Sequence, residues 1–225
     1  YNLNPDFNII WLTNKQQALF VKNFNQTVYH AYKKLKPGAF KADLWRLCVL
    51  FKYGGVYIDS YTIPYMPLSY ILLNTCKNEC SDQFISVRDP DKTSWGGIHN
   101  GFIATSPRHP FIKQCINDIV HNIKNGLYKD HFLAVTGPIC LSRSIAKILK
   151  IHPDTKFKHG YNNYTSYSFY LLSLDMSGIR GLTQPIYKKG VLVMCKKYSL
   201  ARLIYQKFFQ TNYRQLWMSK NIYNK

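Results

Sequence analysis

The chain has 225 residues, of which 46% are hydrophobic and 16% aromatic, and its formal net charge is +19. This composition is enough for one well-buried domain, and we expect residues 1–225 to form it. The apolar runs are far shorter than the roughly 20 residues that a membrane span needs, so we expect no transmembrane segment in this chain. The opening Tyr1-Asn-Leu-Asn-Pro-Asp6 has neither the basic nor the apolar region of a signal peptide.

The positive charge comes from 30 Lys and Arg residues against 11 Asp and Glu residues. Such an excess favours contact with polyanions such as nucleic acid, anionic membranes or phosphorylated ligands. The basic residues are scattered and form no long run, so a solvated lysine-rich surface is the alternative. The chain carries no recognised nucleic-acid-binding motif, so we do not expect nucleic acid as its partner, and a basic nucleic-acid-binding protein is the last-ranked alternative function.

Six cysteines are spread along the chain. Cys48, Cys115 and Cys195 lie inside apolar patterns and are predicted to be buried thiols. Cys76 and Cys80 have a C-x3-C spacing, without a second pair or a histidine at zinc-site spacing. A disulfide between these two residues is the open alternative.

In the first part of the chain, short apolar runs alternate with helical patterns. Pro37-Gly38 begins a central helix, and Gly54 is a natural stop for it. Pro64 and Pro67 then favour a loop. The elements that the pattern predicts here are a buried strand at Asn8–Leu12, helices at Lys15–Phe24 and Tyr29–Leu35, the central helix, and a strand at Val56–Asp59.

In the second part, a period of 3.6 residues predicts an amphipathic helix that starts at Pro110 and ends at Gly126. Residues 152–187 are expected to be irregular. The other predicted elements are strands at Phe84–Val87, Ile98–Ala104 and Val191–Cys195, and helices at Ile139–Leu149 and Leu200–Phe209. Strands that alternate with helices indicate an α/β domain with a largely parallel sheet.

Three charged residues stand in the otherwise apolar stretch from the central helix to the following strand. Asp43 and Arg46 are three residues apart on the helix, so they share a face and can form a simple intrahelical ion pair. Asp59 ends the strand, where ligands gather in open α/β sheets, although a turn or cap role is the alternative. Charge in a core element is costly unless something pairs with it, which makes this stretch a candidate site.

The same stretch resembles the glycosyltransferase family described by a sugar-binding region containing a DXD motif. Its members include fungal initiating mannosyltransferases, viral and capsule enzymes, and glucosylating toxins with the same core. The resembling residues are Ala42-Asp43-x-x-Arg46, Leu50-x-x-Tyr53-Gly54-Gly55-Val56-Tyr57-Ile58-Asp59 and Pro67-Leu68. Weaker matches follow at His99–Ala104, His109–Phe111, Thr136–Pro138, Leu216-Trp217 and Asn221–Tyr223.

The resemblance implies a GT-A-like, Rossmann-related fold and an enzyme that is usually retaining. Such an enzyme moves a sugar from a nucleotide-diphosphate donor to a hydroxyl of a glycan or protein. By resemblance, Asp43 and Arg46 grip sugar and ribose hydroxyls through charge-assisted hydrogen bonds. Asp59 is the first carboxylate of the DXD motif, and no general base is assigned. The remaining residues expected to contact the nucleotide sugar are Tyr57, Asn100, Gly101 and Trp217.

The motif departs from the family at its second acid, because it reads Asp59-Ser60-Tyr61. In the family that acid usually binds Mn²⁺, whereas a neutral phenol is a poor ligand for Mn²⁺ or Mg²⁺. By resemblance, Asn212 and Gln215 would complete a metal site with Asp59. Lysine or arginine side chains that neutralise the diphosphate are a second solution. A third is lost activity, which would leave a non-catalytic nucleotide-sugar or glycan binder.

A further departure concerns the start of the chain. The family normally opens with a strand that carries an Ile-His-Gln-x-Trp segment, which walls the nucleotide base. We expect this strand to be absent here, with Trp11 belonging to the next one. The sequence leaves the oligomeric state open, and the compartment stays open between the cytoplasm, for a virus-encoded enzyme, and the Golgi lumen.

Overall fold

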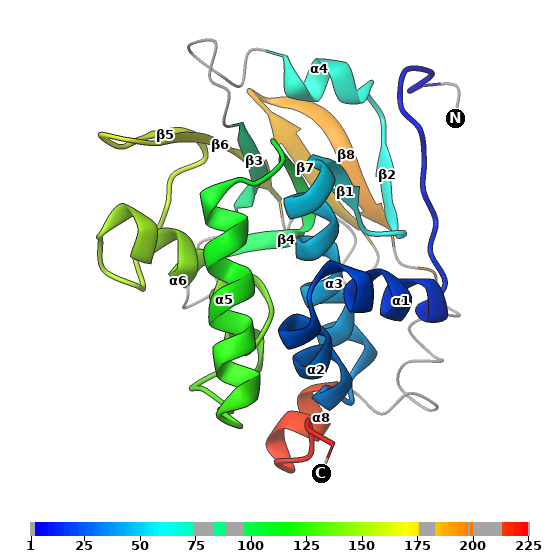
Figure 1. Ribbon diagram of the computed structural model, residues 1–225. Coiled ribbons are helices and arrows are strands. Elements are labelled where there is room, and N and C mark those ends of the chain that lie inside the picture. The colour runs from blue at the N-terminus through cyan, green and yellow to red at the C-terminus, as the bar shows by residue number, and fades with distance from the viewer. Residues whose placement is uncertain are drawn as a thin grey trace.

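A computed structural model describes residues 3–73, 83–88, 97–175, 183–197, 199 and 213–224. Its centre is an eight-stranded sheet, and most of the helices lie together on one side of it (Figure 1). The strand order is β1-β4-β3-β6-β7-β8-β2, with β5 paired to β6. The α/β class that the sequence predicts is therefore confirmed.

The chain begins with three helices: α1 (Asn14–Phe24), α2 (Gln26–Lys34) and α3 (Gly38–Tyr53). Thr13 starts α1 with a capping box to Gln16, and the side chain of Asn25 caps α2. Gly54 ends α3 with a φ of +68°, and a Cβ there would lie 2.7 Å from the backbone nitrogen of Pro107. Both the left-handed conformation and the close contact require glycine, as the predicted helix stop implied.

The rest of the described chain contains both strands and helices. The elements are β1 (Gly55–Ile58), β2 (Thr62–Pro64), α4 (Leu68–Leu72), β3 (Phe84–Arg88), β4 (Ile98–Thr105), α5 (Pro110–Lys124), the 3-10 helix η1 (Phe132–Ala134), α6 (Pro138–Leu149), β5 (Gly160–Asn163), β6 (Ser168–Leu174), β7 (Thr183–Lys188), β8 (Val191–Lys197) and α8 (Tyr213–Met218). The helices at α1, α2, α3, α5 and α6 lie close to their predicted positions.

The expected parallel pairing is wrong for most of the sheet. Only β3 and β6 pair in parallel among the described strands, and every other described pair is antiparallel. Part of the reason is connection length, since parallel neighbours need a long crossover whereas a two-residue turn joins antiparallel strands. Lys189-Gly190 is such a turn between β7 and β8.

The region 152–187, expected to be irregular, contains β5, β6 and all of β7 except its last residue. In β6, Phe169 and Leu171 pack toward the helices, while Tyr170 and Leu172 pack toward the other face. A strand buried on both faces has no polar alternation, so its periodicity does not distinguish it from other apolar segments.

The sheet separates two hydrophobic cores. The larger lies between the sheet and the helices, and its members include Val28, Leu44, Leu47, Ile103, Phe111, Ile119, Ile145 and Phe169. The smaller lies on the opposite face under α4, and includes Leu68, Ile71, Ile85, Phe102, Leu172 and Met194. Alternate residues of β3, β4 and β6 point to opposite cores, as the two-residue period of a strand requires.

The predicted buried strand at Asn8–Leu12 is not formed. These residues have no regular structure, and Ile10 and Trp11 are 75% and 70% exposed. A short apolar run becomes a strand only if a neighbouring strand accepts its hydrogen bonds. Within the described part of the chain, β1 pairs with β4 alone, so this run has not joined the sheet there.

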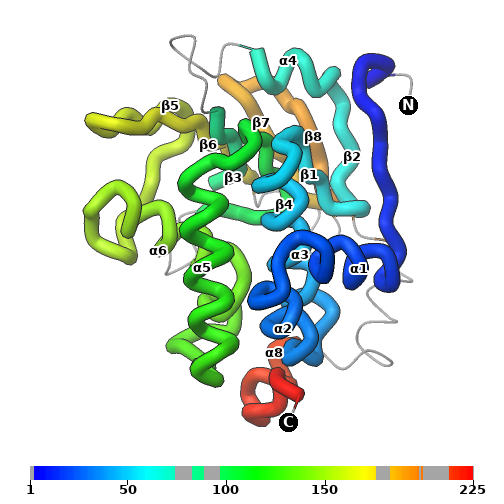
Figure 2. Tube along the Cα trace, in the orientation of Figure 1, coloured from blue at the N-terminus to red at the C-terminus, as the bar shows by residue number. Residues whose placement is uncertain are grey.

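The tail returns to the helical side of the molecule. Figure 2 shows α8 at the end of the chain beside α2 and α3, and Leu35 forms an isolated bridge with Tyr223. The backbone nitrogen of Lys36 donates to the carbonyl of Ile222 at 2.9 Å. These contacts hold the C-terminal segment against the junction between α2 and α3.

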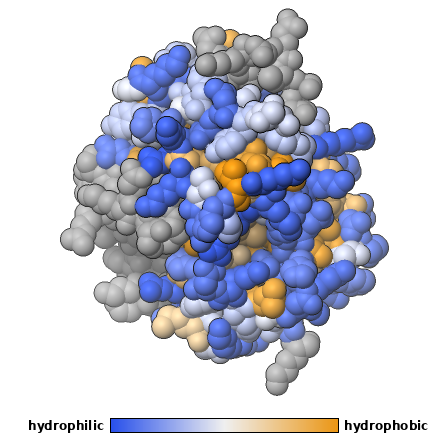
Figure 3. Space-filling view, turned by 90° about the vertical axis from the view of Figure 1, so that its left-hand side faces the viewer, coloured by the Kyte–Doolittle hydropathy of each residue, from blue (hydrophilic) through white to orange (hydrophobic). Residues whose placement is uncertain are grey.

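Several predictions concern other parts of the chain. Cys48, Cys115 and Cys195 are buried free thiols, as predicted. The Cys76–Cys80 pair and the predicted helix at Leu200–Phe209 lie outside the described residues. Within the described ranges, no helix is long and apolar enough to cross a membrane. The face shown in Figure 3 is largely hydrophilic, with hydrophobic residues in small patches.

Candidate active site

The first half of the site is an ion pair on α3. Asp43 and Arg46 are 9% and 6% exposed, and an oxygen of Asp43 lies 3.2 Å from a guanidinium nitrogen of Arg46. The helical spacing of three residues brings both onto the face that meets the sheet. The predicted intrahelical pair therefore exists, and it is buried.

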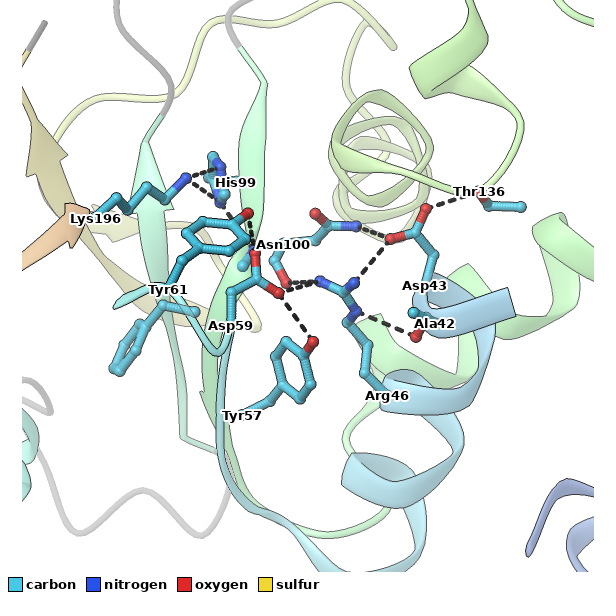
Figure 4. A network of polar contacts seen from close by, with 12 residues as sticks. Ala42, Asp43, Arg46, Tyr57, Asp59, Tyr61, His99, Asn100, Thr136 and Lys196 are labelled. Atoms are coloured by element: carbon cyan, nitrogen blue, oxygen red, sulfur yellow. Dashed lines mark hydrogen bonds and ion pairs between the residues drawn. The ribbon is translucent and has the colours of Figure 1, made fainter. Parts of the chain in front are cut away.

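Arg46 connects this helix to two strands (Figure 4). Its Nη1 lies 3.4 Å from Oδ1 of Asp59 and donates to the carbonyl of Asn100 at 2.7 Å. Its guanidinium also lies over the ring of Tyr57, with 4.4 Å between the guanidinium carbon and the ring centroid. One arginine thus links the middle of α3 to the end of β1 and to β4.

Asp43 is surrounded by donors. The side-chain amide of Asn100 donates to Oδ1 and the hydroxyl of Thr136 donates to Oδ2, both at 2.8 Å. Together with Arg46, these groups suit an ionised carboxylate. Burial nevertheless raises the pKa of Asp43 to about 6, against the lowering effects of Arg46, Thr136 and Asn100. Asp43 is therefore ionised at neutral pH, close to the range in which it takes up a proton.

Asp59 directly follows β1, and its two carboxylate oxygens face tyrosines. Tyr57 donates its hydroxyl hydrogen to Oδ1 at 2.9 Å, and Tyr61 donates to Oδ2 at 2.5 Å. Burial raises the pKa of Tyr57, so this phenol stays protonated and remains a donor. The carbonyl of Asp59 also accepts the backbone N–H of Thr62, so the alternative turn role is present as well.

Gly101 lets β4 approach the carboxylate. A Cβ on this residue would lie 2.4 Å from Oδ2 of Asp59 and 2.6 Å from the ring of His99. Its carbonyl accepts the backbone N–H of Asp59 at 2.8 Å. The need for glycine here is steric, because any side chain would displace Asp59 or His99.

Two residues that the sequence did not assign to the site lie beside Tyr61. His99 accepts the backbone N–H of Gly101 at its Nδ1, and Lys196 on β8 contacts its Nε2. Lys196 is 2% exposed, and its ammonium lies 5.9 Å from the centroid of the Tyr61 ring. Burial, followed by the charges of Lys196 and Arg46, lowers the pKa of His99 well below its ordinary value, so the imidazole is neutral.

The remaining predicted residues come from the tail. On α8, the indole nitrogen of Trp217 donates to the carbonyl of Tyr128 at 2.5 Å, and its ring lies 6.3 Å from that of Phe132. Gln215 lies on the same helix, and Asn212 lies outside the described residues. Figure 4 brings together Asp43, Arg46, Tyr57, Asp59 and Asn100, whereas the roles of Trp217, Gln215 and Asn212 stay predictions.

The described residues offer few metal ligands. They contain no group of three or more His, Cys, Asp or Glu side chains that could hold a metal ion. Tyr61 occupies the position of the second DXD acid and donates a hydrogen bond to Asp59 instead of offering an anionic oxygen. The donor set therefore does not fit the divalent metal that the DXD motif implies.

Comparison with known proteins agrees with this site. Residues 1–82 match the model of the family described as "Glycosyltransferase sugar-binding region containing DXD motif". Over this region the chain is similar to these glycosyltransferases. The match includes Asp43, Arg46, Tyr57 and Asp59, which confirms the resemblance inferred from the sequence.

Curated relatives are fungal mannosyltransferases. The chain is 27% identical to mannosyl phosphorylinositol ceramide synthase CSH1 of Saccharomyces cerevisiae over 143 residues, which cover 63% of this chain and 35% of the relative. It is 27% identical to initiation-specific alpha-1,6-mannosyltransferase of Candida albicans over 131 residues, covering 52% and 34% of the two chains. The chain thus spans about a third of the length of these relatives.

Among solved structures, PaToxG glycosyltransferase is similar with a TM-score of 0.39 and 18% identity, over 60% of this chain and 42% of that one.

Sequence reasoning missed three residues of the network for one reason. Thr136 and His99 stand only in the weaker matching blocks, and Lys196 is one of the scattered basic residues. Their side chains reach the site from positions distant in the chain, such as the 93 residues that separate Thr136 from Asp43. The block that holds Asn100 and Gly101 was a signal for His99, but no local signal marked Lys196.

Proposed function

We propose that this chain binds a nucleotide-diphosphate sugar and transfers the sugar to a hydroxyl of a glycan or protein. The observation that carries the proposal is the buried Asp43–Arg46–Asp59 network at the end of β1, within the region that matches the family. Keeping three charges in a core is costly, and a polar ligand gives that arrangement a use. The names of the relatives make mannose the first sugar to test.

Each half of the network suits a different part of the donor. Asp43 and Arg46 present a carboxylate and a guanidinium, which bind sugar and ribose hydroxyls through charge-assisted hydrogen bonds. Tyr57 and Tyr61 are partly exposed and the side chain of Asp59 is 12% exposed, so the network reaches the surface here. Catalysis then rests on holding the donor in place and stabilising the diphosphate that leaves. A retaining outcome is part of the proposal, and we assign no general base.

The test is a panel of UDP- and GDP-sugars, measured for binding and for hydrolysis or transfer. We expect Asp59→Ala to abolish donor binding, because it removes the carboxylate that Arg46, Tyr57 and Tyr61 hold. Tyr61→Ala should weaken binding less, since Asp59 keeps its other two partners. If the protein tolerates both changes equally well, the motif has no role in binding the donor.

A second candidate is a non-catalytic binder of nucleotide sugars or glycans. The hydrogen bond from Tyr61 to Asp59 favours it, because the second acid of the motif is replaced by a donor. The same panel separates the two candidates. Tight binding without hydrolysis or transfer of any sugar supports the binder, whereas turnover that disappears in Asp59→Ala supports the enzyme.

A further inference from the structure

We propose that Lys196 supplies, against the donor's diphosphate, the positive charge that a divalent metal supplies in DXD glycosyltransferases. This inference rests on the proposed function and deepens it. It follows from the mismatch between the DXD motif and its surroundings, and from the position of one buried lysine.

The carboxylate of Asp59 is already engaged by protein groups. Oδ1 accepts from Tyr57 and faces Arg46, and Oδ2 accepts from Tyr61. A hard divalent cation would have to displace these donors, and Tyr61 offers it only a neutral phenol in return. The position where the motif implies a second anionic ligand therefore favours an arrangement without metal.

The balance of charge in the network also favours an arrangement without metal. Of the groups labelled in Figure 4, Asp43 and Asp59 are carboxylates, while Arg46 and Lys196 are cations and His99 is neutral. The negative charge is thus already matched, and none is left over to attract a divalent metal. The two cations would act instead on a ligand that brings its own negative charge, as a diphosphate does.

The backbone fixes Lys196 beside the DXD segment. On β8 it pairs with Thr62 of β2, and the N–H of the next residue, Lys197, donates to the carbonyl of Tyr61 at 2.8 Å. The sheet register, not the flexibility of a long side chain, therefore brings the ammonium to this point. The ammonium of Lys196 contacts the ring of His99 and lies over the ring of Tyr61.

The ammonium also lies where its charge acts most strongly. Lys196 is almost fully buried, while Asp59, Tyr61 and His99 in front of it are only partly buried. Because water screens a buried charge poorly, a diphosphate bound on this face would interact with Lys196 over several ångströms. A fixed cation of this kind stabilises the charge that develops on a leaving diphosphate.

The experiment compares two neighbouring lysines on β8. Binding of UDP and GDP is measured by calorimetry for the wild type, Lys196→Met and Lys197→Met, each in EDTA and in Mn²⁺. Lys197 is exposed, so its substitution removes the same charge from the other side of the strand. We expect Lys196→Met to bind the diphosphates about tenfold more weakly or worse, the range of a lost hydrogen bond to a charged group. Lys197→Met should bind nearly as the wild type does.

Metal dependence gives an independent readout. We expect EDTA to leave binding by the wild type unchanged and Mn²⁺ to add little. Binding by the wild type that requires Mn²⁺, or unchanged affinity in Lys196→Met, overturns the inference. If Lys196→Met does not fold, Lys196→Gln takes its place, because it removes the charge and keeps a polar side chain. The comparison of EDTA with Mn²⁺ on the wild type tests the inference without either variant. A wild type that binds no nucleotide or nucleotide sugar under either condition contradicts the proposed function instead.

Discussion

Among the described residues, two ion networks of three residues each can be compared, one buried and one exposed. In the buried network, Arg46 lies 3.2 and 3.4 Å from Asp43 and Asp59, and the side chains are 7 to 12% exposed. In the exposed network, Nη1 and Nη2 of Arg143 each donate to one carboxylate oxygen of Asp130 at 2.7 Å. There Asp130 is 61% exposed, and Asp154 is 54% exposed. The exposed network therefore has the shorter distances between its charged atoms.

The two networks shift carboxylate pKa values in opposite directions. Burial raises the pKa of Asp43 to about 6, whereas hydrogen bonding to Arg143 lowers the pKa of Asp130 to about 2. The exposed network joins α6 to neighbouring loops. Its Arg143 lines a surface hollow of about 480 Å³, whose lining includes no residue of the Asp59 network. The shorter ion-pair distances thus belong to a surface contact that requires little desolvation. The candidate site is instead distinguished by the free-energy cost of burying its charges.

The largest expected difference comes from removing each arginine. Arg46→Met leaves two carboxylates buried without their cation, so we expect a loss of about 3–5 kcal/mol in the free energy of unfolding. For Arg143→Met, water compensates the exposed carboxylates, and the loss should be about 1 kcal/mol or less. Denaturant unfolding at neutral pH measures both values. Equal losses would mean that burial does not separate the two networks.

A smaller effect should follow from crowding Asp59. Gly101→Ala places a Cβ 2.4 Å from Oδ2 of Asp59, so we expect a loss of about 1–3 kcal/mol together with weaker donor binding. Gly38→Ala is the matched control, because a Cβ there has nothing within 4 Å. The same unfolding measurement applies, and a Gly101→Ala protein as stable as the control would show that β4 can move away.

The two carboxylates should give opposite slopes of stability against pH. The folded state holds the proton of Asp43 more tightly, so its contribution is complete below the ordinary pKa of 3.8 and is lost as pH rises through about 6. The contribution of Asp130 is present above that ordinary value and is lost as pH falls toward 2.

Unfolding measured across this pH range checks both signs. Asp43→Asn should remove the slope between about pH 4 and 6, and Asp130→Asn the slope at lower pH. Either slope surviving its substitution would assign it to another group.

The smallest expected effect is at the edge of the exposed network. Asp154→Asn removes one partly screened contact to Arg143, and we expect a change within about 0.5 kcal/mol that disappears at high salt. Unfolding at low and high ionic strength measures it. A change that persists at high salt would show that the exposed network is less hydrated than its surface position indicates.

Much of the local structure was predictable from sequence. The 3.6-residue period located α5, and glycine with its neighbouring prolines bounded α3. The pair Asp43 and Arg46 and the nearby Asp59 were also identified, because they lie within 17 positions of one another on a helix and the strand after it. These features depend on neighbours in the chain, which a single sequence displays directly.

Local sequence patterns were enough to place the helices, the glycine stop and the Asp43–Arg46–Asp59 half of the site. The antiparallel pairing, the exposure of Asn8–Leu12 and the position of Lys196 beside His99 and Tyr61 depend on the packed fold. The contact between Lys196 and His99 joins residues 97 positions apart. Such contacts follow from strand order and register, which depend on how distant segments pack, so no local pattern reveals that the cation near the DXD segment is a lysine on β8.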